Sequence, residues 1–150
     1  MKVAVICYEK LSETIRLQVR IEEEICKFIK NGADTFYFCG TKSCFDNLCY
    51  RAVGYYSQNK NIKRVLARAH YEYVSIEEDI CNSVLEFTEN ETFYDNPQKE
   101  FIVYLRPYCD IIDLSDVVFA YFNPHIKSVN AALKYAKIKR KKIINVYELL

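Results

Sequence analysis

The stretch that constrains the fold most is Phe36-Tyr37-Phe38-Cys39-Gly40-Thr41-Lys42-Ser43-Cys44-Phe45-Asp46. It predicts an aromatic strand that ends at a single glycine, then a short polar turn, then the first turn of a helix. The chain contains only three glycines, and Gly40 stands where backbone N–H groups can meet an anionic ligand. The competing interpretation is a tight strand-to-helix connection in which Ser43 is the N-cap.

Strands and helices alternate outward from this turn. Apolar runs predict strands at Lys2 to Cys7, Thr35 to Cys39, Ile62 to Ala67, Asp116 to Phe122 and Lys142 to Val146. Helical spacing predicts helices that run from Ser12 to the stop at Asn31-Gly32, from Phe45 to Gln58, from Gln98 to Asp113 and from Lys127 to Lys139. This order implies an α/β fold, a Rossmann-like three-layer α/β/α sandwich with a mostly parallel sheet, in one domain spanning 1–150.

The same spacing predicts which side chains face the core. On the first helix these are Ile15, Val19, Ile21, Ile25, Cys26 and Ile29, and on the second they are Leu48, Cys49, Ala52, Val53 and Tyr56. The middle of the chain is less regular. The segment Ile76 to Phe87 fits either a helix or a helix followed by a short strand, and 88–92 reads as a polar loop.

Composition narrows the class of protein. Apolar residues make up 51% of 150 residues, which indicates a globular domain, and the net charge of +1 argues against a protein built mainly to coat nucleic acid. The 7 cysteines are odd in number and form no Cys-x-x-Cys pair, which argues against a zinc site. We expect no metal and no cofactor. We find no signal peptide and no apolar run of membrane-spanning length, and therefore expect a cytoplasmic protein without a membrane partner.

Four segments together resemble a known superfamily. Residues 38–49 match a Phe-Gly-Ser-x-Ser-x-Phe-Asp-x-Leu-Cys turn, residues 112–116 match an Ile-Asp-x-Ser-Asp stretch, and 62–71 and 135–145 agree in order and spacing. On these residues the chain resembles the SLOG superfamily, which includes the Smf/DprA DNA-processing proteins and the Lonely-Guy phosphoribohydrolases. It is most similar to small Firmicutes members of unassigned function. The resemblance implies a Rossmann-like fold that binds a nucleotide or a nucleotide-derived small molecule.

The resemblance also implies a site at the carboxyl ends of the first, second and fourth of these predicted strands. Its expected ligand-binding residues are Gly40, Thr41, Ser43, Phe45, Asp46, Arg68, Arg106, Ser128 and Asn130. Arg68 ends the third strand at the edge where open α/β sheets bind ligands, and can pair with a phosphate. Asp46 either holds a sugar hydroxyl, acts as a general base, or complements the helix dipole.

Departures from the superfamily weaken the prediction of catalysis. Relatives carry Gly-His after the first strand, where this chain has Cys7-Tyr8, and Ser-Gly-Thr where it has Lys127-Ser128-Val129-Asn130. Pro107-Tyr108 replaces an Arg-Asn pair next to Arg106, and the Pro-Gly-Gly-x-Gly-Thr motif of the Lonely-Guy enzymes is absent. A binding or sensing module is therefore the first hypothesis.

Two other functions stay open. The second hypothesis is an N-glycosidic nucleotide hydrolase whose catalytic carboxylate is Asp46; a nucleophilic pair of Cys44 and His70 is a weaker idea. The third is a nucleic-acid-binding or scaffold protein with a decayed pocket. The basic run at Lys137, Lys139, Arg140, Lys141 and Lys142 suits nucleic acid, although cations at a helix C-terminus also offset its dipole. The sequence leaves a homodimer open.

Overall fold

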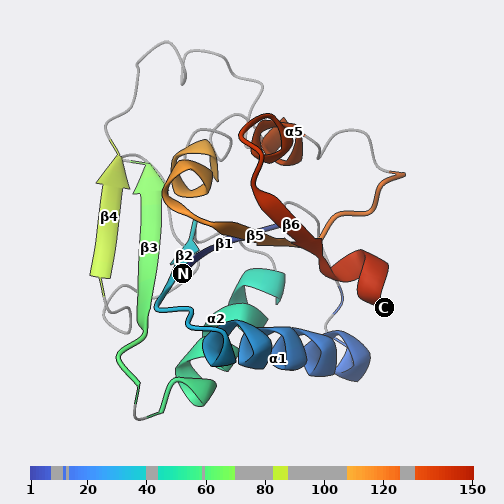
Figure 1. The fold of residues 1–150 in the computed structure, drawn as a ribbon. Helices are drawn as coiled ribbons and strands as arrows, with labels where there is room; N and C mark the ends of the chain where they lie inside the picture. The colour runs from blue at the N-terminus through green and yellow to red at the C-terminus, as the bar shows by residue number, and fades with distance from the viewer. Residues whose placement is uncertain are drawn as a thin grey trace.

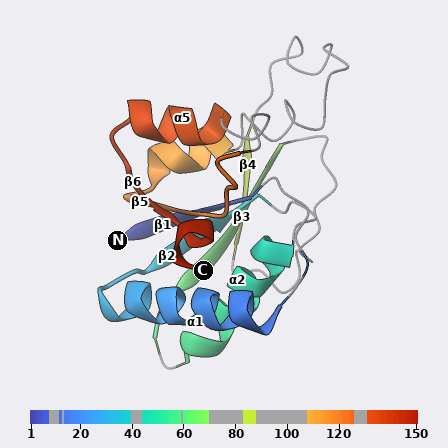
Figure 2. The ribbon, with the colours of Figure 1, turned by 90° about the vertical axis from the view of Figure 1, so that its right-hand side faces the viewer.

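The computed structural model describes residues 1–7, 12, 14–39, 44–58, 60–69, 83–87, 108–125 and 131–150. For 68–69 and 83–87 the description covers the backbone alone. In this part of the chain a six-stranded sheet lies between two layers of helices, as Figures 1 and 2 show from two sides. The Rossmann-like α/β/α fold predicted from the alternating pattern is confirmed.

The sheet is parallel at every pairing of its described strands. Its strand order is β4-β3-β2-β1-β5-β6, so β1 is central and the order reverses between β1 and β5. We call the edge where the strands end the carboxyl edge, and the edge where they begin the amino edge. The strands are β1 (Lys2–Ile6), β2 (Thr35–Phe38), β3 (Lys63–Ala69), β4 (Ser83–Phe87), β5 (Val117–Ala120) and β6 (Lys142–Asn145).

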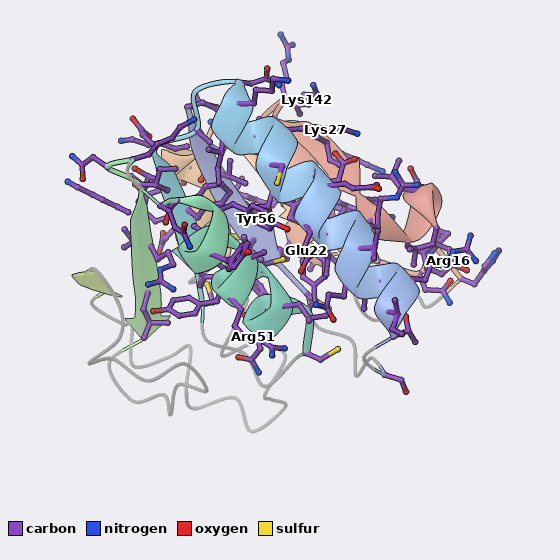
Figure 3. All side chains as sticks on the ribbon, turned by 90° about the horizontal axis from the view of Figure 1, so that it is seen from below. Arg16, Glu22, Lys27, Arg51, Tyr56 and Lys142 are labelled. Carbon is purple, nitrogen blue, oxygen red and sulfur yellow. The ribbon has the colours of Figure 1, made fainter. Side chains whose placement is uncertain are left out.

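Helices α1 (Ile15–Lys30) and α2 (Cys44–Tyr56) cover one face of the sheet. The helical residues 108–114 and α5 (Ala131–Ile138) cover the other face (Figure 2). A short 3₁₀ helix, η3 (Val146–Leu149), follows β6. Figure 3 looks onto the outside of α1 and α2, where the Tyr56 hydroxyl donates to Glu22 Oε2 at 3.5 Å and links the two helices.

The start of α1 corrects one prediction about the core. Thr14 is the N-cap, because its Oγ1 accepts the Leu17 N–H at 3.1 Å. Ile21, Ile25 and Ile29 are buried as expected, but Ile15 is 82% exposed and Val19 is 46% exposed, so the expectation that they face inward is wrong. The buried stripe follows a different set of positions, Leu17, Ile21, Glu24, Ile25, Phe28 and Ile29, which places Ile15 and Val19 beyond its border.

The α1–α2 layer is packed with large aromatic side chains. Phe119 of β5 is fully buried, and its ring centroid lies 5.3 Å from that of Phe28 and 5.4 Å from that of Phe45. On α2, the expected inward positions Leu48, Cys49, Ala52 and Val53 are buried. Apolar area of this kind supplies most of a domain's stability, at about 25 cal/mol per Å² removed from water.

The Arg64 side chain of β3 packs against Tyr50 of α2. The Arg64 guanidinium carbon lies 4.2 Å from the centroid of the Tyr50 ring, and Nη1 donates to the Tyr50 carbonyl at 3.4 Å. A Cβ at Gly54 would lie 2.6 Å from that Nη1. Gly54 therefore leaves room inside α2 for the arginine, although glycine within a helix costs roughly 1 kcal/mol relative to alanine.

The opposite layer mixes alanines with larger side chains. The alanines are Ala4, Ala67, Ala120, Ala132 and Ala136, and the larger side chains include Tyr108, Ile111, Ile112 and Phe122. Polar contacts hold it at several points. The Tyr135 hydroxyl of α5 donates to both oxygens of Asp113 at 2.8 Å, which joins α5 to the segment 108–114. The Ser115 hydroxyl donates to the Ile111 carbonyl at 2.7 Å, and Asp116 Oδ2 accepts the Lys2 N–H at 2.9 Å. The motif at 112–116 thus has structural roles in ending a helix and aligning β5 with β1.

The other predicted segments agree in type and differ at their boundaries. Helix α2 begins at Cys44 and ends at Tyr56, β5 is shorter than predicted, and 108–114 extends the expected helix to Leu114. The short strand within Ile76 to Phe87 is confirmed at Ser83–Phe87, while 70–82 lie outside the described residues. A membrane-spanning helix is not found among the described residues.

Candidate functional site

The carboxyl edge between β1 and β5 is where this topology places a ligand site. In open α/β sheets, ligands bind outside the carboxyl ends of the strands at the point where strand order reverses. Here β1 ends at Ile6, β2 at Phe38 and β5 at Ala120, so Cys7, Cys39 and Tyr121 come next at this edge. Cys7 and Cys39 are fully buried, and Tyr121 is partly exposed.

Helix α2 brings two of the predicted site residues to this edge. Phe45 and Asp46 stand in its first turn, and both are completely buried. The Phe45 ring packs against Phe119 and, at a centroid distance of 6.2 Å, against Tyr121. Phe45 therefore belongs to the aromatic core beneath the edge. Asp46 is a buried carboxylate in the first turn of α2, where the helix dipole favours a negative charge. The roles considered for Asp46 from sequence stay predictions.

The cysteines near this carboxylate have the character of core thiols. Burial raises the pKa of the Cys49 thiol well above its usual value, and the nearby Asp46, Cys7 and Cys44 raise it further. A thiol with a raised pKa is a poor nucleophile at neutral pH. His70, the proposed partner of Cys44, lies outside the described residues. Within the described residues, no group of three His, Cys, Asp or Glu is placed to hold a metal ion.

Tyr108 closes the end of β1 on the other face of the sheet. Its side chain is fully buried, its hydroxyl donates to the Cys7 carbonyl at 2.8 Å, and the same hydroxyl accepts the Cys7 N–H at 3.3 Å. Both backbone groups of Cys7 are thereby satisfied from the side of 108–114. A ligand at this edge is therefore expected to approach from the side of α1 and α2.

Tyr121 is a partly exposed aromatic side chain on that side. Its backbone N–H donates to the Ile6 carbonyl at 3.2 Å, which extends the pairing of β5 with β1. Its ring contacts Phe45 and meets the Tyr147 ring edge-on, with centroids 5.7 Å apart. Sequence reasoning missed Tyr121 as a site residue. Its position directly after a buried strand that neighbours β1 is the signal that could have identified it.

A small open cleft lies beside the ends of β5 and β6. It has a volume of about 170 Å³, and its lining includes Phe122, Lys134, Lys137 and Asn145. Asn145 is engaged within the fold, because its side chain accepts the Phe122 N–H and donates to the Phe122 carbonyl, both at 2.9 Å. The cleft is smaller than the ~300–1,000 Å³ typical of ligand sites, so it does not by itself hold a nucleotide.

The remaining predicted site residues are mostly not described. Arg68 lies in β3 near the carboxyl edge as expected, with its backbone alone described. Six further residues lie outside the described part of the chain: Gly40, Thr41, Ser43, Arg106, Ser128 and Asn130. Of the predicted set, the described residues therefore place Asp46 and Phe45 together beneath the carboxyl edge.

Comparison with known proteins finds similar solved structures and no match by sequence to a family or a curated protein. A molybdenum cofactor carrier protein from Chlamydomonas reinhardtii is similar, with a TM-score of 0.57 at 11% identity, over 95% of this chain and 73% of that one. A structural-genomics target, TM1055, gives a TM-score of 0.61 at 14% identity, over 95% of this chain and 71% of the other.

A third similar structure comes from a protein described by its single-stranded DNA binding mode. It is DNA processing protein A from Helicobacter pylori, with a TM-score of 0.60 at 14% identity, over 95% of this chain and 63% of that one. At such identities the likeness shows the fold and no activity. These neighbours are consistent with the SLOG-type fold that the sequence motifs indicated, and the chain therefore shares a Rossmann-like architecture with a cofactor carrier and a DNA-processing protein.

Proposed function

We propose that this chain binds a nucleotide or a nucleotide-derived small molecule at the carboxyl edge, on the side of α1 and α2. The observation that carries the proposal is a fully buried carboxylate, Asp46, together with a partly exposed aromatic ring, Tyr121, at the point where the strand order reverses. A nucleoside offers a flat base that can stack on a tyrosine and hydroxyl groups that can donate to a carboxylate.

The other residues of the proposed site complete this arrangement. Gly40, Thr41 and Ser43 would contribute the anion-binding turn between β2 and α2, and Arg68 would supply a cation for a phosphate. Arg106, Ser128 and Asn130 would complete the polar lining. We further propose membership of the SLOG superfamily, a single domain and a cytoplasmic location.

A thermal-shift screen tests the binding proposal. Nucleoside monophosphates, dinucleotides and sugar phosphates are added in turn, and a ligand at 100 times its Kd should stabilise the fold by about 2.7 kcal/mol. Asp46→Asn and Tyr121→Leu should each reduce the shift. Tyr55→Leu is the matched control, because Tyr55 is 65% exposed on α2 and lies outside the proposed site.

The outcomes separate the presence of a site from its location. Absence of any shift in the wild type would overturn nucleotide binding and favour a scaffold with a decayed pocket. A shift that persists undiminished in both Asp46→Asn and Tyr121→Leu would place the ligand elsewhere.

Asp46 also keeps the hydrolase as a second candidate. A carboxylate beside a ribose can stabilise an oxocarbenium-like transition state or activate water, and burial of Asp46 is the observation that favours such a role. The test is release of free base from nucleoside monophosphates, which Asp46→Asn should abolish while binding is measured separately. If the wild type binds nucleotides and releases no base, the chain is a binding module.

A further inference from the structure

The amino edge of the sheet gathers cationic side chains. Strands β1, β3 and β6 each begin with a lysine, and α1 and α5 end at this edge with further basic residues. We define the basic edge as Lys2, Lys30, Lys60, Lys63, Lys139, Arg140, Lys141 and Lys142, all of which are exposed or partly exposed. This set exceeds the basic run seen in the sequence, because the parallel topology brings distant strand starts together.

The carboxylates of the same region are already engaged. Asp34 Oδ1 lies 3.8 Å from the N-terminal ammonium, and Asp116 Oδ2 accepts the backbone N–H of Lys2. Asp113 accepts the Tyr135 hydroxyl and lies 4.0 Å from Lys139 Nζ. Among the residues that the structure describes, Lys139 is the single member of the basic edge with a carboxylate within 4.0 Å. Most of these charges therefore lack an internal counter-charge.

The basic edge extends over both faces of the sheet. Lys2 and Lys63 are in register through Thr35 of β2, so they lie two strand spacings apart, roughly 10 Å. Lys142 is paired with Val117, whose side chain packs in the α1–α2 core, and Figure 3 shows Lys142 near the same end of α1 as Lys27. A row of separated cations along this edge matches the repeating charges of a phosphate chain.

Arg140 occupies a backbone position at this edge that favours glycine. Its φ is +57°, and its N–H and that of Lys141 close the end of α5 by donating to the carbonyls of Lys137 and Ala136, both at 3.0 Å. The end of α1 has the same hydrogen-bond pattern but uses Gly32, with φ +94°. An L-residue at such a position costs about 1 kcal/mol relative to glycine. Within the described residues Arg140 makes no ion pair that would offset this cost.

We propose that the basic edge binds the phosphate backbone of a nucleic acid without reading its bases. Lysine side chains act as point charges, which position a protein on a phosphate backbone and carry no sequence information. The surface lies at the opposite end of the strands from the proposed nucleotide site, so the two sites do not overlap. An anionic membrane is the competing partner, since Ile138 and Leu114 are exposed close to these cations, 75% and 42% respectively.

Fluorescence anisotropy of a labelled mixed-sequence oligonucleotide, single-stranded or duplex, tests the proposal. Affinity should fall steeply with salt, and the triple variant Lys139→Gln, Lys141→Gln and Lys142→Gln should bind about tenfold or more weakly with a smaller salt slope. The matched control removes the same charge elsewhere, with Arg16→Gln, Arg51→Gln and Lys134→Gln, and should bind as the wild type does.

Arg140→Gly separates the charge of this residue from its structural role. It should raise Tm by about 2–4 °C, because it relieves the backbone cost, and yet weaken binding of the oligonucleotide. The proposal is overturned by no binding at low salt, by equal losses in the control triple variant, or by unchanged affinity in Arg140→Gly. It is also overturned if anionic vesicles bind the protein while oligonucleotides do not, or if a mononucleotide competes with the oligonucleotide.

Discussion

The two helix layers hold the same sheet by different means. On the side of α1 and α2, the contact consists of interlocked aromatic rings around Phe119. On the other side, alanines pack among larger side chains such as Ile111, Ile112 and Phe122. Hydroxyl groups add hydrogen bonds there, from Tyr108 to Cys7 and from Tyr135 to Asp113. Both layers therefore bury apolar area, and the second layer adds directional contacts whose loss also costs free energy.

Removal of a buried aromatic ring should lower the free energy of unfolding more than the other changes proposed here. It should also cost more in the α1–α2 layer than in the opposite layer. Phe119→Ala should cost about 3–5 kcal/mol, because the surrounding rings cannot close the cavity. Phe122→Ala is the matched change in the other layer, where the ring borders the open cleft and water can enter. We expect a smaller loss there in chemical unfolding. An equal or larger loss at Phe122 would contradict the difference between the layers.

Loss of a single buried hydroxyl group should give the next largest loss of stability. Tyr108→Phe retains the ring but leaves the buried N–H and carbonyl of Cys7 without this partner, at a cost of about 1–3 kcal/mol. Tyr135→Phe serves as control, since Asp113 at that position is exposed and water can replace the lost contact. Comparison of the two unfolding free energies checks the prediction. Equal losses would show that burial does not increase the contribution of the Tyr108 hydrogen bonds to stability.

A double-mutant cycle tests the cation in the aromatic layer. In an Arg64→Ala background, Gly54→Ala should stabilise the protein by about 1 kcal/mol, because the helix gains propensity with no guanidinium in the way. In the wild type the same change should gain less, since Arg64 must leave its place over Tyr50. Unfolding free energies of the four proteins give the coupling. A coupling of zero would show that Gly54 has no role in placing Arg64.

The smallest effect should be the pH dependence of the stability that Tyr135 contributes. Burial, followed by the hydrogen bond to Asp113, raises the pKa of Tyr135 to about 12. Because the folded state holds this proton more tightly than the unfolded state, the contribution is fully present below about pH 10 and is lost as pH rises toward 12. The difference in unfolding midpoint between wild type and Tyr135→Phe should shrink over that window. A constant difference across it would contradict the assignment.

Local periodicity predicted most strands and several buried helix positions. It did not predict contacts between residues far apart in the sequence. The strand runs and the inward positions Leu48, Cys49, Ala52 and Val53 follow from spacing alone. The bond from Tyr108 to Cys7 joins residues 101 positions apart, and no local pattern specifies such a pair. The prediction that Ile15 and Val19 face inward failed for a local reason. Both are apolar, but they lie near the start of α1 and outside the stripe of positions that faces the sheet.

The candidate site was predictable in its edge and less so in its residues. The turn at 38–46 pointed to the carboxyl edge, and the resemblance singled out Asp46, yet sequence could not show that Asp46 and Phe45 face inward. That depends on how the first turn of α2 is rotated against β5. Tyr121 was not among the predicted residues because the fourth strand was expected to run to Phe122, whereas β5 ends at Ala120 and leaves Tyr121 directly after it.

The central place of β1 has a consequence for how the chain is made. β1 leaves the ribosome first, yet one of its two neighbours in the sheet, β5, begins only at Val117. At translation rates of about 5–20 residues per second, the emerging strand waits for several seconds or more with one hydrogen-bonding side unpaired. Its run Val3-Ala4-Val5-Ile6 is apolar and β-branched, which is the composition that favours pairing with another chain. Pairing of this strand with β2, which follows after a single helix, would protect one of its sides early in synthesis.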